Sequence, residues 1–253
     1  MTPTAEQVVR LQQLIAEARL RLDARFPQTF PDTGPFSRDK YQKQIAFFAA
    51  GAMHKERLFM AANRVGKSLA GAYEVTCHLT GLYPAWWTGR RFTEPVDVWA
   101  SGTNSQTTRD IVQAHLLGPV HAPGTGMIPA HLIAQVTPAR GIAGALEGAR
   151  IKHVSGGVSL LGLKSYEQGR SSFEGTAKHV IWDDEEPPAA VYPEQLYRTV
   201  TTRGIALVTF TPLRGVTDLV QHFQELHGSN GVYLRGASWN DAPHLSEEDK
   251  TRL

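Results

Sequence analysis

The chain has 253 residues, of which 42% are hydrophobic and 20% charged, and this length fits one large α/β domain or two small ones. The composition supports a sizeable core and excludes a disordered chain. The 26 Lys and Arg residues against 24 Asp and Glu residues give a net charge of +2, which excludes a histone-like basic arm and an acidic tail.

The cysteine content and the amino-terminal residues indicate the cellular compartment in which the protein folds. Cys77 is the single cysteine, so an intramolecular disulfide is impossible and a reducing compartment is favoured. No apolar run approaches the roughly 18 residues of a membrane-spanning helix. The first twenty residues carry charged side chains where a signal peptide would be apolar. We therefore expect a soluble protein that is not secreted by that route.

An amphipathic helix is predicted near the amino terminus. Thr4 and Gln7 have the spacing of a capping box. Apolar residues then recur at helical spacing, at Val8, Leu11, Ile15, Ala18 and Leu22. Prolines and a glycine between positions 27 and 35 end this helix and form a linker. The helix would pack against its own domain or, alternatively, make a short coiled-coil contact with another subunit.

From residue 36 onward, apolar strand patterns alternate with helical patterns. The predicted strands are Arg57–Ala62, Val96–Ser101, a hairpin of Ile151–Val154 and Ser159–Leu163, Val180–Trp182 and Ile205–Thr211. The predicted helices run to Leu79 after the first strand, from about Asn104 to Leu117, and near Asp218–Leu226. Residues 118–150 predict no clear element. This alternation predicts an α/β fold with a mostly parallel sheet and helices on both faces.

Residues 61–68 (AANRVGKS) join the first predicted strand to the first helix. They match the phosphate-loop pattern G-x-x-x-x-G-K-[ST] at Gly66, Lys67 and Ser68, but Ala61 replaces the first glycine. Gly66 allows a phosphate to approach the backbone at the helix start. Lys67 would place a cation on the β- and γ-phosphates, and Ser68 can bind Mg²⁺. Arg64 would clamp the γ-phosphate or, alternatively, be a solvated loop residue.

Four acidic residues, Asp183, Asp184, Glu185 and Glu186, directly follow a strand of buried type. Like charges this close repel one another, and a bound Mg²⁺ would relieve that repulsion. One aspartate would hold the metal's water shell, and the next acid would orient or deprotonate an attacking water. The pattern leaves two registers open, Asp183 with Asp184 or Asp184 with Glu185. A solvated acidic loop is the alternative.

Two threonines, Thr209 and Thr211, close the last predicted strand. Hydroxyl groups at the carboxyl end of a central strand can sense a γ-phosphate. The alternative is a pair of ordinary strand-end threonines.

Together these segments resemble the large terminase subunits of tailed bacteriophages, which are ATP-driven DNA-packaging motors. The resemblance rests on NRVGKS at 63–68, WDDEEP at 182–187 and TFTPLRG at 209–215, in this order. Supporting segments are LTGLYP at 79–84 with a Trp pair at 86–87, and KSYEQGR at 164–170. The resemblance covers residues from about Tyr41 to Leu245.

The resemblance implies a P-loop ATPase of the additional-strand class, in which the threonine strand lies between the lysine-loop strand and the acidic strand. The family's first motif commonly lacks the leading glycine and carries an arginine. Its acidic motif usually has an apolar residue before Asp-Glu, which places Asp184 on Mg²⁺ and makes Glu185 the catalytic base. Asp183 departs from that pattern and keeps the other register open. An upstream glutamine that contacts adenine in the family would match Gln44.

The implied cofactors are ATP and Mg²⁺. The implied catalytic residues are Glu185, Arg64 and Lys67, and the implied metal ligands are Ser68 and Asp184. The implied nucleotide-binding residues are Gln44, Asn63, Arg64, Val65, Gly66, Lys67, Ser68, Thr209 and Thr211. If a trans-acting arginine is needed, the candidates are Arg140, Arg150, Arg170 and Arg203.

The resemblance also implies an organisation and a setting. We expect an amino-terminal helix and linker (1–35), an ATPase domain (36–245), and the start of a linker (246–253) to a nuclease domain absent from this sequence. The implied partners are double-stranded DNA, the portal protein, the terminase small subunit and further copies in a ring on the procapsid, with no membrane. The implied location is the host cytoplasm and, transiently, the portal vertex. Alternatives are a helicase-like or other DNA-stimulated ATPase and a nucleotide-regulated DNA-binding module.

Overall fold

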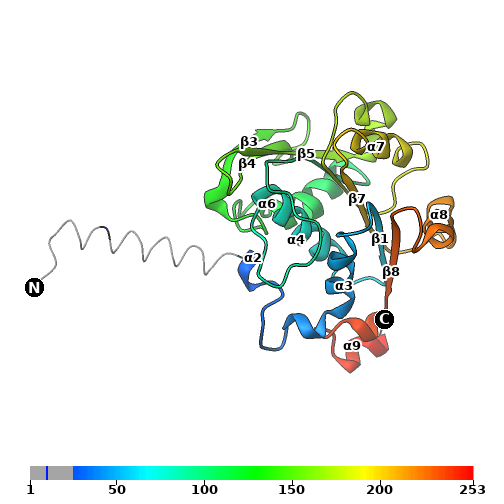
Figure 1. Cartoon of the computed structure of the whole chain (residues 1–253). Helices are drawn as coiled ribbons and strands as arrows, with labels where there is room; N and C mark the ends of the chain where they lie inside the picture. Colours follow the sequence, from blue (N-terminus) through cyan, green and yellow to red (C-terminus); the bar gives the residue numbers. More distant parts are fainter. Residues whose placement is uncertain (1–9, 11–24, 253) are drawn as a thin grey trace, which may run out of the picture.

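An eight-stranded sheet forms the centre of the computed structural model, which describes residue 10 and residues 25–252 (Figure 1). The helix predicted between Thr4 and Leu22 lies outside the described residues. The strands are β1 Glu56–Ala61, β2 Asp97–Gly102, β3 Ile133–Pro138, β4 Leu146–Lys152, β5 Val158–Ser165, β6 Val180–Asp184, β7 Ile205–Phe210 and β8 Val232–Ala237. Every predicted strand is present; most ends are shifted by one or two residues, but β4 begins five residues before the predicted Ile151–Val154.

The strands are ordered β3-β4-β5-β2-β6-β7-β1-β8. The six strands from β5 to β8 in this order are parallel, and the β3–β4 and β4–β5 pairs are antiparallel. The predicted hairpin is therefore confirmed as β4–β5. β7, the threonine strand, lies between β6 and β1, as the resemblance implied. Because parallel strands end at the same edge of a sheet, the loops after β1, β6 and β7 meet there.

Helices cover both faces of the sheet, which confirms the predicted α/β architecture. In Figure 1, α3, α4 and α6 lie on one face and α7 and α8 on the other. The helices are α2 Arg25–Gln28, α3 Gln42–Ala50, α4 Lys67–Thr80, α5 Ser105–Thr107, α6 Ala114–Leu117, α7 Tyr192–Thr199, α8 Asp218–Leu226 and α9 Glu247–Arg252. A π-helical stretch, Thr108–Gln113, joins α5 to α6, so the helix predicted from 104 to 117 is present. None of the described helices is long and apolar enough to cross a bilayer.

The elements that were not predicted include β3, β8, α2, α3 and α7. β3 lies at the edge of the sheet, and all but one of its residues are exposed. β8 forms the opposite edge and has a single fully buried residue. An edge strand without a buried face lacks the apolar alternation that identifies a strand in sequence. Residues 118–150 therefore contain β3 and the start of β4 without a recognisable pattern.

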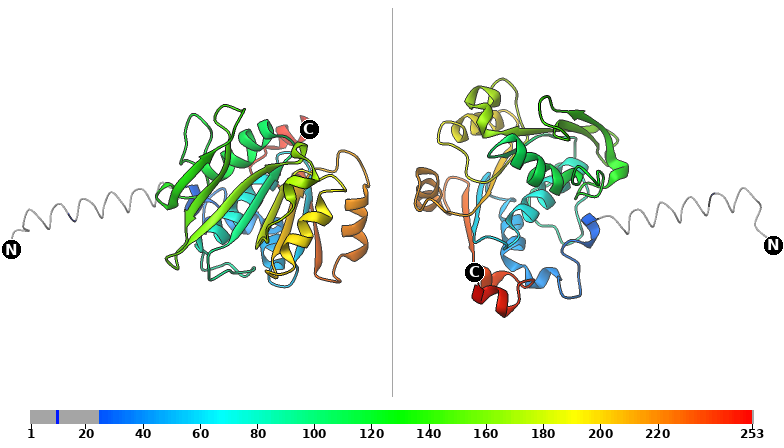
Figure 2. Two further views of the ribbon diagram at one scale, coloured as in Figure 1. Left: turned by 90° about the horizontal axis from the view of Figure 1, so that it is seen from above. Right: turned by 180° about the vertical axis from the view of Figure 1, so that it is seen from behind.

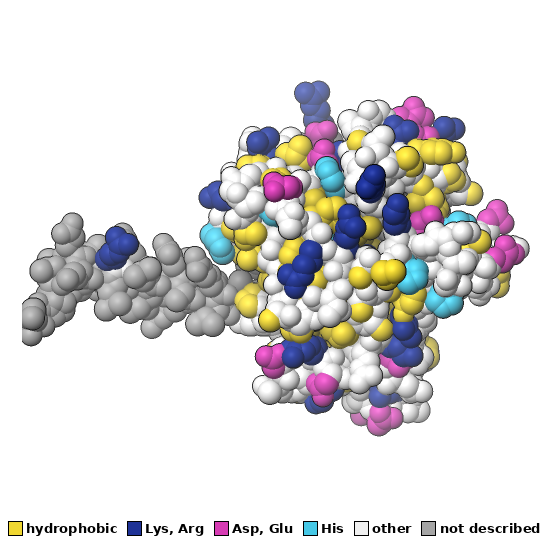
Figure 3. Space-filling view, in the orientation of Figure 1, with side chains coloured by type: hydrophobic (Ala, Val, Ile, Leu, Met, Phe, Trp, Pro, Cys, Tyr) yellow, Lys and Arg dark blue, Asp and Glu magenta, His cyan; other side chains and the backbone are white. Residues whose placement is uncertain are grey.

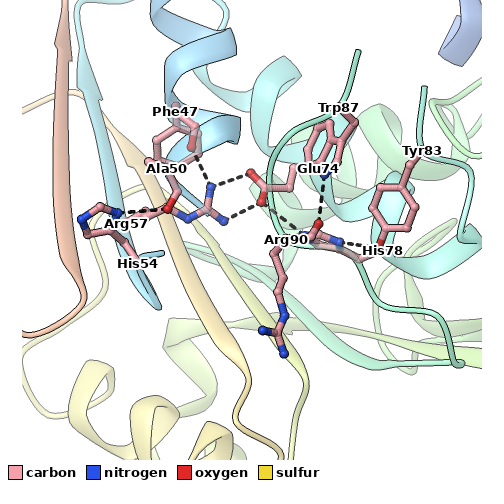
Figure 4. Close-up of polar contacts among 9 residues, drawn as sticks. All are labelled: Phe47, Ala50, His54, Arg57, Glu74, His78, Tyr83, Trp87 and Arg90. Atoms are coloured by element: carbon pink, nitrogen blue, oxygen red, sulfur yellow. Dashed lines mark hydrogen bonds and ion pairs between the residues drawn. The ribbon is translucent and has the colours of Figure 1, made fainter. Parts of the chain in front are cut away.

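A fully buried ion pair joins the two elements that flank the lysine loop (Figure 4). Arg57 of β1 donates to both carboxylate oxygens of Glu74 of α4, at 3.0 and 2.5 Å, and to the carbonyl of Phe47 at 2.8 Å. His78 lies 3.2 Å from Glu74, and its other ring nitrogen lies 3.0 Å from the hydroxyl of Tyr83. Burial raises the pKa of Glu74, but the charge of Arg57 and these hydrogen bonds outweigh it and hold the pKa below its ordinary value.

Glu74→Ala should therefore destabilise the fold strongly. The substitution leaves the Arg57 guanidinium buried without its counter-charge, which costs about 3–5 kcal/mol of unfolding free energy. Urea denaturation measures this loss. The double variant Arg57→Met with Glu74→Leu is the control, because it removes both charges and should lose much less. Equal losses in the single and double variants would contradict this explanation.

Candidate functional site

The loop between β1 and α4 has the backbone of an anion-binding turn. Gly66 precedes the first residue of α4 with φ at +90°, a conformation that glycine adopts without strain. Arg64 also has a positive φ, +66°, and its side chain is exposed. A non-glycine residue with a positive φ is strained and persists only where the surrounding structure holds it. Such residues are common at ligand-binding sites. The loop therefore presents the amino-terminal N–H groups of α4 at the carboxyl edge of the sheet.

Lys67 is buried at this edge and joins β1 to β7. Its Nζ donates to the carbonyl of Ala62 at 3.0 Å and to the hydroxyl of Thr211 at 2.6 Å. The Thr211 hydroxyl in turn donates to Oδ1 of Asn63 at 2.9 Å. Burial lowers the pKa of Lys67, and the nearby Glu185 and acidic strand end oppose that shift. Lys67 and Asn63 are thus linked through Thr211, and all three are predicted site residues.

Three consecutive carbonyls of the loop accept hydrogen bonds from side chains elsewhere in the chain. The bonds run from Trp239 Nε1 to Asn63 O (2.9 Å), from His244 Nε2 to Arg64 O (2.7 Å) and from Gln44 Nε2 to Val65 O (2.9 Å). These contacts fix the orientation of the loop's peptide groups. Gln44 was a predicted site residue. Trp239 and His244 were missed, because no sequence signal connects them to a loop more than 170 positions away.

A small cavity of about 290 Å³ lies beside this loop. Its lining includes Gly66, Leu69, Tyr41, Phe36 and Gln44. The Oε1 atom of Gln44 is buried and has no hydrogen-bond partner among the described residues. A buried acceptor next to an aromatic-lined cavity fits a planar ligand that carries an N–H donor.

Asp184, the last residue of β6, points toward the lysine loop. Its Oδ1 accepts a hydrogen bond from Thr209 at 2.8 Å, and the Ser68 hydroxyl interacts with it closely enough to lower its pKa. Burial has the larger, opposite effect and raises the pKa of Asp184 to about 7. The two residues predicted to bind Mg²⁺, Ser68 and Asp184, therefore lie together.

Asp183 has a different environment, because successive residues of a strand face opposite sides of the sheet. It is fully buried, and its Oδ1 accepts hydrogen bonds from Gln195 at 2.7 Å and Tyr166 at 3.2 Å. Burial raises the pKa of Asp183 to about 7. This geometry favours the register in which Asp184, rather than Asp183, faces the nucleotide loop.

The raised pKa of Asp183 predicts a pH-dependent stability. The pKa rises on folding from 3.8 to about 7, so the folded protein keeps a proton that the unfolded chain releases between these pH values. The free energy of unfolding should therefore fall as pH rises from about 4 to 7. Asp183→Asn removes the titrating group, so this variant should lose less stability over that range. Urea denaturation without metal or nucleotide measures both proteins, and parallel pH profiles would contradict the prediction.

Glu185 follows β6 in a strained conformation, with φ at +84°. Its N–H donates to the carbonyl of Thr209 at 2.9 Å, and its carbonyl accepts from the hydroxyl of Tyr166 at 2.8 Å. Burial raises the pKa of the Glu185 carboxyl, while Lys67 and the N–H of Thr211 oppose that shift. Backbone contacts on both sides thus hold residue 185, and its carboxylate lies close enough to Lys67 for the two charges to interact. Tyr166 lies within KSYEQGR, but its role had no sequence signal.

The two predicted threonines have different contacts. Thr209 is fully buried, accepts a hydrogen bond from Trp182 Nε1 at 2.9 Å and donates to Asp184. Thr211, at the end of β7, contacts Lys67 instead. Thr209 therefore orients the acidic strand, and Thr211 is the threonine that reaches the lysine loop.

The sheet order, the lysine loop and the acidic strand end define a P-loop NTPase fold of the additional-strand class. A family model, the N-terminal part of the terminase large subunit of T4likevirus type, matches residues 58–251. The chain belongs to this family.

Known proteins agree with this assignment. The chain is 35% identical over 233 residues to the terminase large subunit of Salmonella phage P22, covering 84% of this chain and 46% of that protein. It thus spans about half the length of that curated relative. The ATPase domain of the Thermus phage P74-26 large terminase superposes with a TM-score of 0.53 at 16% identity, covering 79% and 82% of the two chains.

The large terminase of the thermophilic bacteriophage D6E superposes with a TM-score of 0.60 at 12% identity, covering 84% of this chain and 48% of that one. A crystal form of the same terminase in complex with ADP gives 0.59 at 13% identity, with the same coverage of both chains. These likenesses confirm the fold.

Proposed function

We propose that this chain is the ATP-hydrolysing motor domain that powers translocation of double-stranded viral DNA into a procapsid. The convergence of Lys67, Asp184, Glu185 and Thr211 at one sheet edge carries the proposal. A cation, a metal-type carboxylate and a second aimed carboxylate are the groups that phosphoryl transfer to water requires. Binding alone needs no base, so this set favours an ATPase over a nucleotide-regulated binding module.

ATP would bind with its phosphates on the amino-terminal end of α4. Gly66 and the neighbouring N–H groups would hold the phosphate oxygens, and Lys67 would leave Thr211 to contact the β- and γ-phosphates. Asn63 and Val65 would shape the loop, and Arg64, exposed beside it, would reach the γ-phosphate. Adenine would enter the cavity beside Gln44, where its exocyclic amine could donate to the unpartnered Oε1 atom.

The oxygen atoms of Ser68 and Asp184 fit a magnesium ion, which prefers oxygen ligands and commonly binds through one or two carboxylates together with substrate phosphates. The described residues contain no group of three or more His, Cys, Asp or Glu side chains that would hold a metal ion by itself. The ion would therefore arrive with the nucleotide, and its charge would favour ionised Asp184.

Glu185 would act as the general base. Its carboxylate would accept a proton from the attacking water as that water approaches the γ-phosphate. The positive φ and the two backbone hydrogen bonds restrict where the carboxylate can point, which is the positioning that such a step needs.

We propose further that the working form is a ring of copies on the procapsid, with DNA, the portal protein and the small terminase subunit as partners in the host cytoplasm. All four candidate trans-acting arginines are exposed, and of these Arg170 is engaged by Glu194 at 3.0 Å, whereas Arg140, Arg150 and Arg203 form no ion pair among the described residues. Exposed guanidinium groups are free to reach a neighbouring subunit.

ATP turnover measured over a hundredfold range of protein concentration, with and without double-stranded DNA, tests this proposal. An arginine from a neighbour is worth about 10³–10⁵ in rate where one is used. Specific activity should therefore be low in the dilute monomer and rise with assembly. A flat, fast rate from a protein shown to be monomeric would reject the trans-acting arginine and favour Arg64 acting within its own subunit.

The same assay separates the alternatives. No hydrolysis under any condition would reject the ATPase assignment in favour of a nucleotide-regulated binding module. Translocation along single strands but not duplex DNA would indicate a helicase-like motor.

A further inference from the structure

Among the residues that the structure describes, no helix covers one face of the β3–β4–β5 end of the sheet. In the left view of Figure 2 these strands lie in front, while α7 covers the other half of the same face. The side chains that point the other way, including Ala149, Ile151, Leu161 and Leu163, belong to the main hydrophobic core. Sheet faces in α/β proteins are usually covered, so an open face calls for an explanation.

The register of the strands defines which residues share the open face. Arg150 pairs with Leu160 and with Gln135, Lys152 pairs with Val158, and Gly148 pairs with Gly162 and Thr137. Lys164 follows two positions after Gly162 and therefore points the same way. The open face thus carries Gln135, Thr137, Gly148, Arg150, Lys152, Val158, Leu160, Gly162 and Lys164.

Three of these residues are cations and none is acidic. Glu147 is the only acid in the three strands. It lies where the β3–β4 register shifts, and its negative charge opposes the lowering of the Lys164 pKa by burial, so it lies near Lys164. Arg150 and Lys152 are exposed, and no ion pair of either residue occurs among the described part of the chain. By contrast, the face shown in Figure 3 carries side chains of both charges.

A glycine and an indole ring form the inner border of the open face. Gly162 lies beneath the indole of Trp99, where a Cβ atom would approach the ring to 2.8 Å. Lys164 lies 5.3 Å and Lys178 4.9 Å from the centre of that indole, and Asp97 pairs with Lys178 at 3.5 Å. Asp97 therefore balances the charge of Lys178, and Glu147 partly balances that of half-buried Lys164, which leaves Arg150 and Lys152 as the exposed cations of this face without an ion pair among the described residues.

We propose that this open face binds the phosphate backbone of double-stranded DNA through Arg150 and Lys152, with Lys164 at its inner border. The inference rests on the proposed function, because a DNA motor needs a sequence-independent contact with duplex DNA. Lys152 lies beside Val158, which precedes Lys164 by six residues in β5. The cations therefore span about 20 Å along the strands. A duplex of that length carries about twelve phosphates on its two strands.

Charge complementarity favours DNA over a second copy of the chain. A surface with two exposed cations that form no ion pair among the described residues, two uncharged polar groups and two exposed aliphatic side chains matches a polyanion, whereas a chain of net charge +2 offers no comparable excess of negative charge. Arginine and lysine contacts to phosphate read no bases, so binding should not depend on sequence.

The test compares DNA binding by the 253-residue chain without nucleotide, using fluorescence anisotropy on two unrelated duplexes over a range of salt concentrations. The double variant Arg150→Gln with Lys152→Gln should lower the salt slope by about 1.8, because each lost phosphate contact contributes about 0.9. At about 0.1 M salt this corresponds to a roughly 60-fold loss of affinity on both duplexes.

Two controls separate charge from fold. Lys55→Gln with Arg252→Gln removes the same charge from exposed residues just before β1 and at the end of α9, outside the open face. This variant should keep the wild-type slope. Arg150→Lys with Lys152→Arg keeps the charge and should keep the slope and most of the affinity.

The proposal is overturned if the wild-type chain does not bind duplex DNA at low salt, or if both neutralised variants have the same slope. It is also overturned if the charge-conserving variant loses binding, or if the Arg150 and Lys152 variant changes self-association in sedimentation instead of the DNA slope. None of these results affects the ATPase assignment, which nucleotide hydrolysis tests separately.

Discussion

Lys67→Ala should abolish ATP hydrolysis and weaken nucleotide binding. The substitution removes the buried cation that would face the β- and γ-phosphates. Loss of one preorganised charge-stabilising group typically costs at least about 10²–10³ in turnover, since such groups act in a site shielded from water. Phosphate release measures turnover, and titration with a fluorescent nucleotide measures affinity.

Lys55→Ala is the matched control for this substitution. Lys55 is an exposed lysine just before β1, at the edge of the sheet opposite the loop. It should leave turnover and nucleotide affinity unchanged. The stability of Lys67→Ala should remain close to wild type, because Thr211 keeps its hydrogen bond to Asn63. Wild-type turnover in Lys67→Ala would reject the phosphate-loop assignment.

Glu185→Gln should retain Mg·ATP binding and slow turnover by about 10²–10⁴-fold, the usual contribution of a positioned general base. The amide has the same size as the carboxylate and leaves the backbone contacts of residue 185 in place. It cannot accept the proton of the attacking water. Equilibrium binding of ATP combined with single-turnover hydrolysis separates the two effects.

Substitutions of the neighbouring acidic residues serve as comparisons for Glu185→Gln. Asp184→Asn should remove the metal dependence of nucleotide binding, because it alters the carboxylate beside Ser68. Glu186→Gln should have little effect, since Glu186 contacts Thr217 at the start of α8 rather than the loop. If Asp183→Asn produced the metal defect and Asp184→Asn the slow turnover, the register would be shifted by one residue.

β7 gives a physical route between these groups. It pairs with β1 on one side and β6 on the other, so one strand carries both Thr209 beneath Asp184 and Thr211 beside Lys67. When phosphates draw Lys67 away from Thr211, the end of β7 loses a contact. We expect this strand to respond to the state of the nucleotide.

The sequence alone determined the fold class and the core of the candidate site. Gly66-Lys67-Ser68 is recognisable because phosphate binding needs particular residues at consecutive positions of one turn. The acids after Val180–Trp182 stand out because several carboxylates at a buried strand end are costly without a ligand. These signals are local, so they could be read without the fold. The placement of the threonine strand between the other two followed from the resemblance and is confirmed by the sheet order.

Only the tertiary structure decided the rest. Trp239 and His244 bond to the loop from across the chain, and nothing in their local sequence indicates it. The preference for Asp184 over Asp183 depends on which face of β6 each residue occupies, and the separate contacts of Thr209 and Thr211 depend on the strands beside β7. The cations of the open sheet face share a surface only because β4 and β5 pair in one register. These contacts join residues that are far apart in the chain, so no local sequence pattern predicts them.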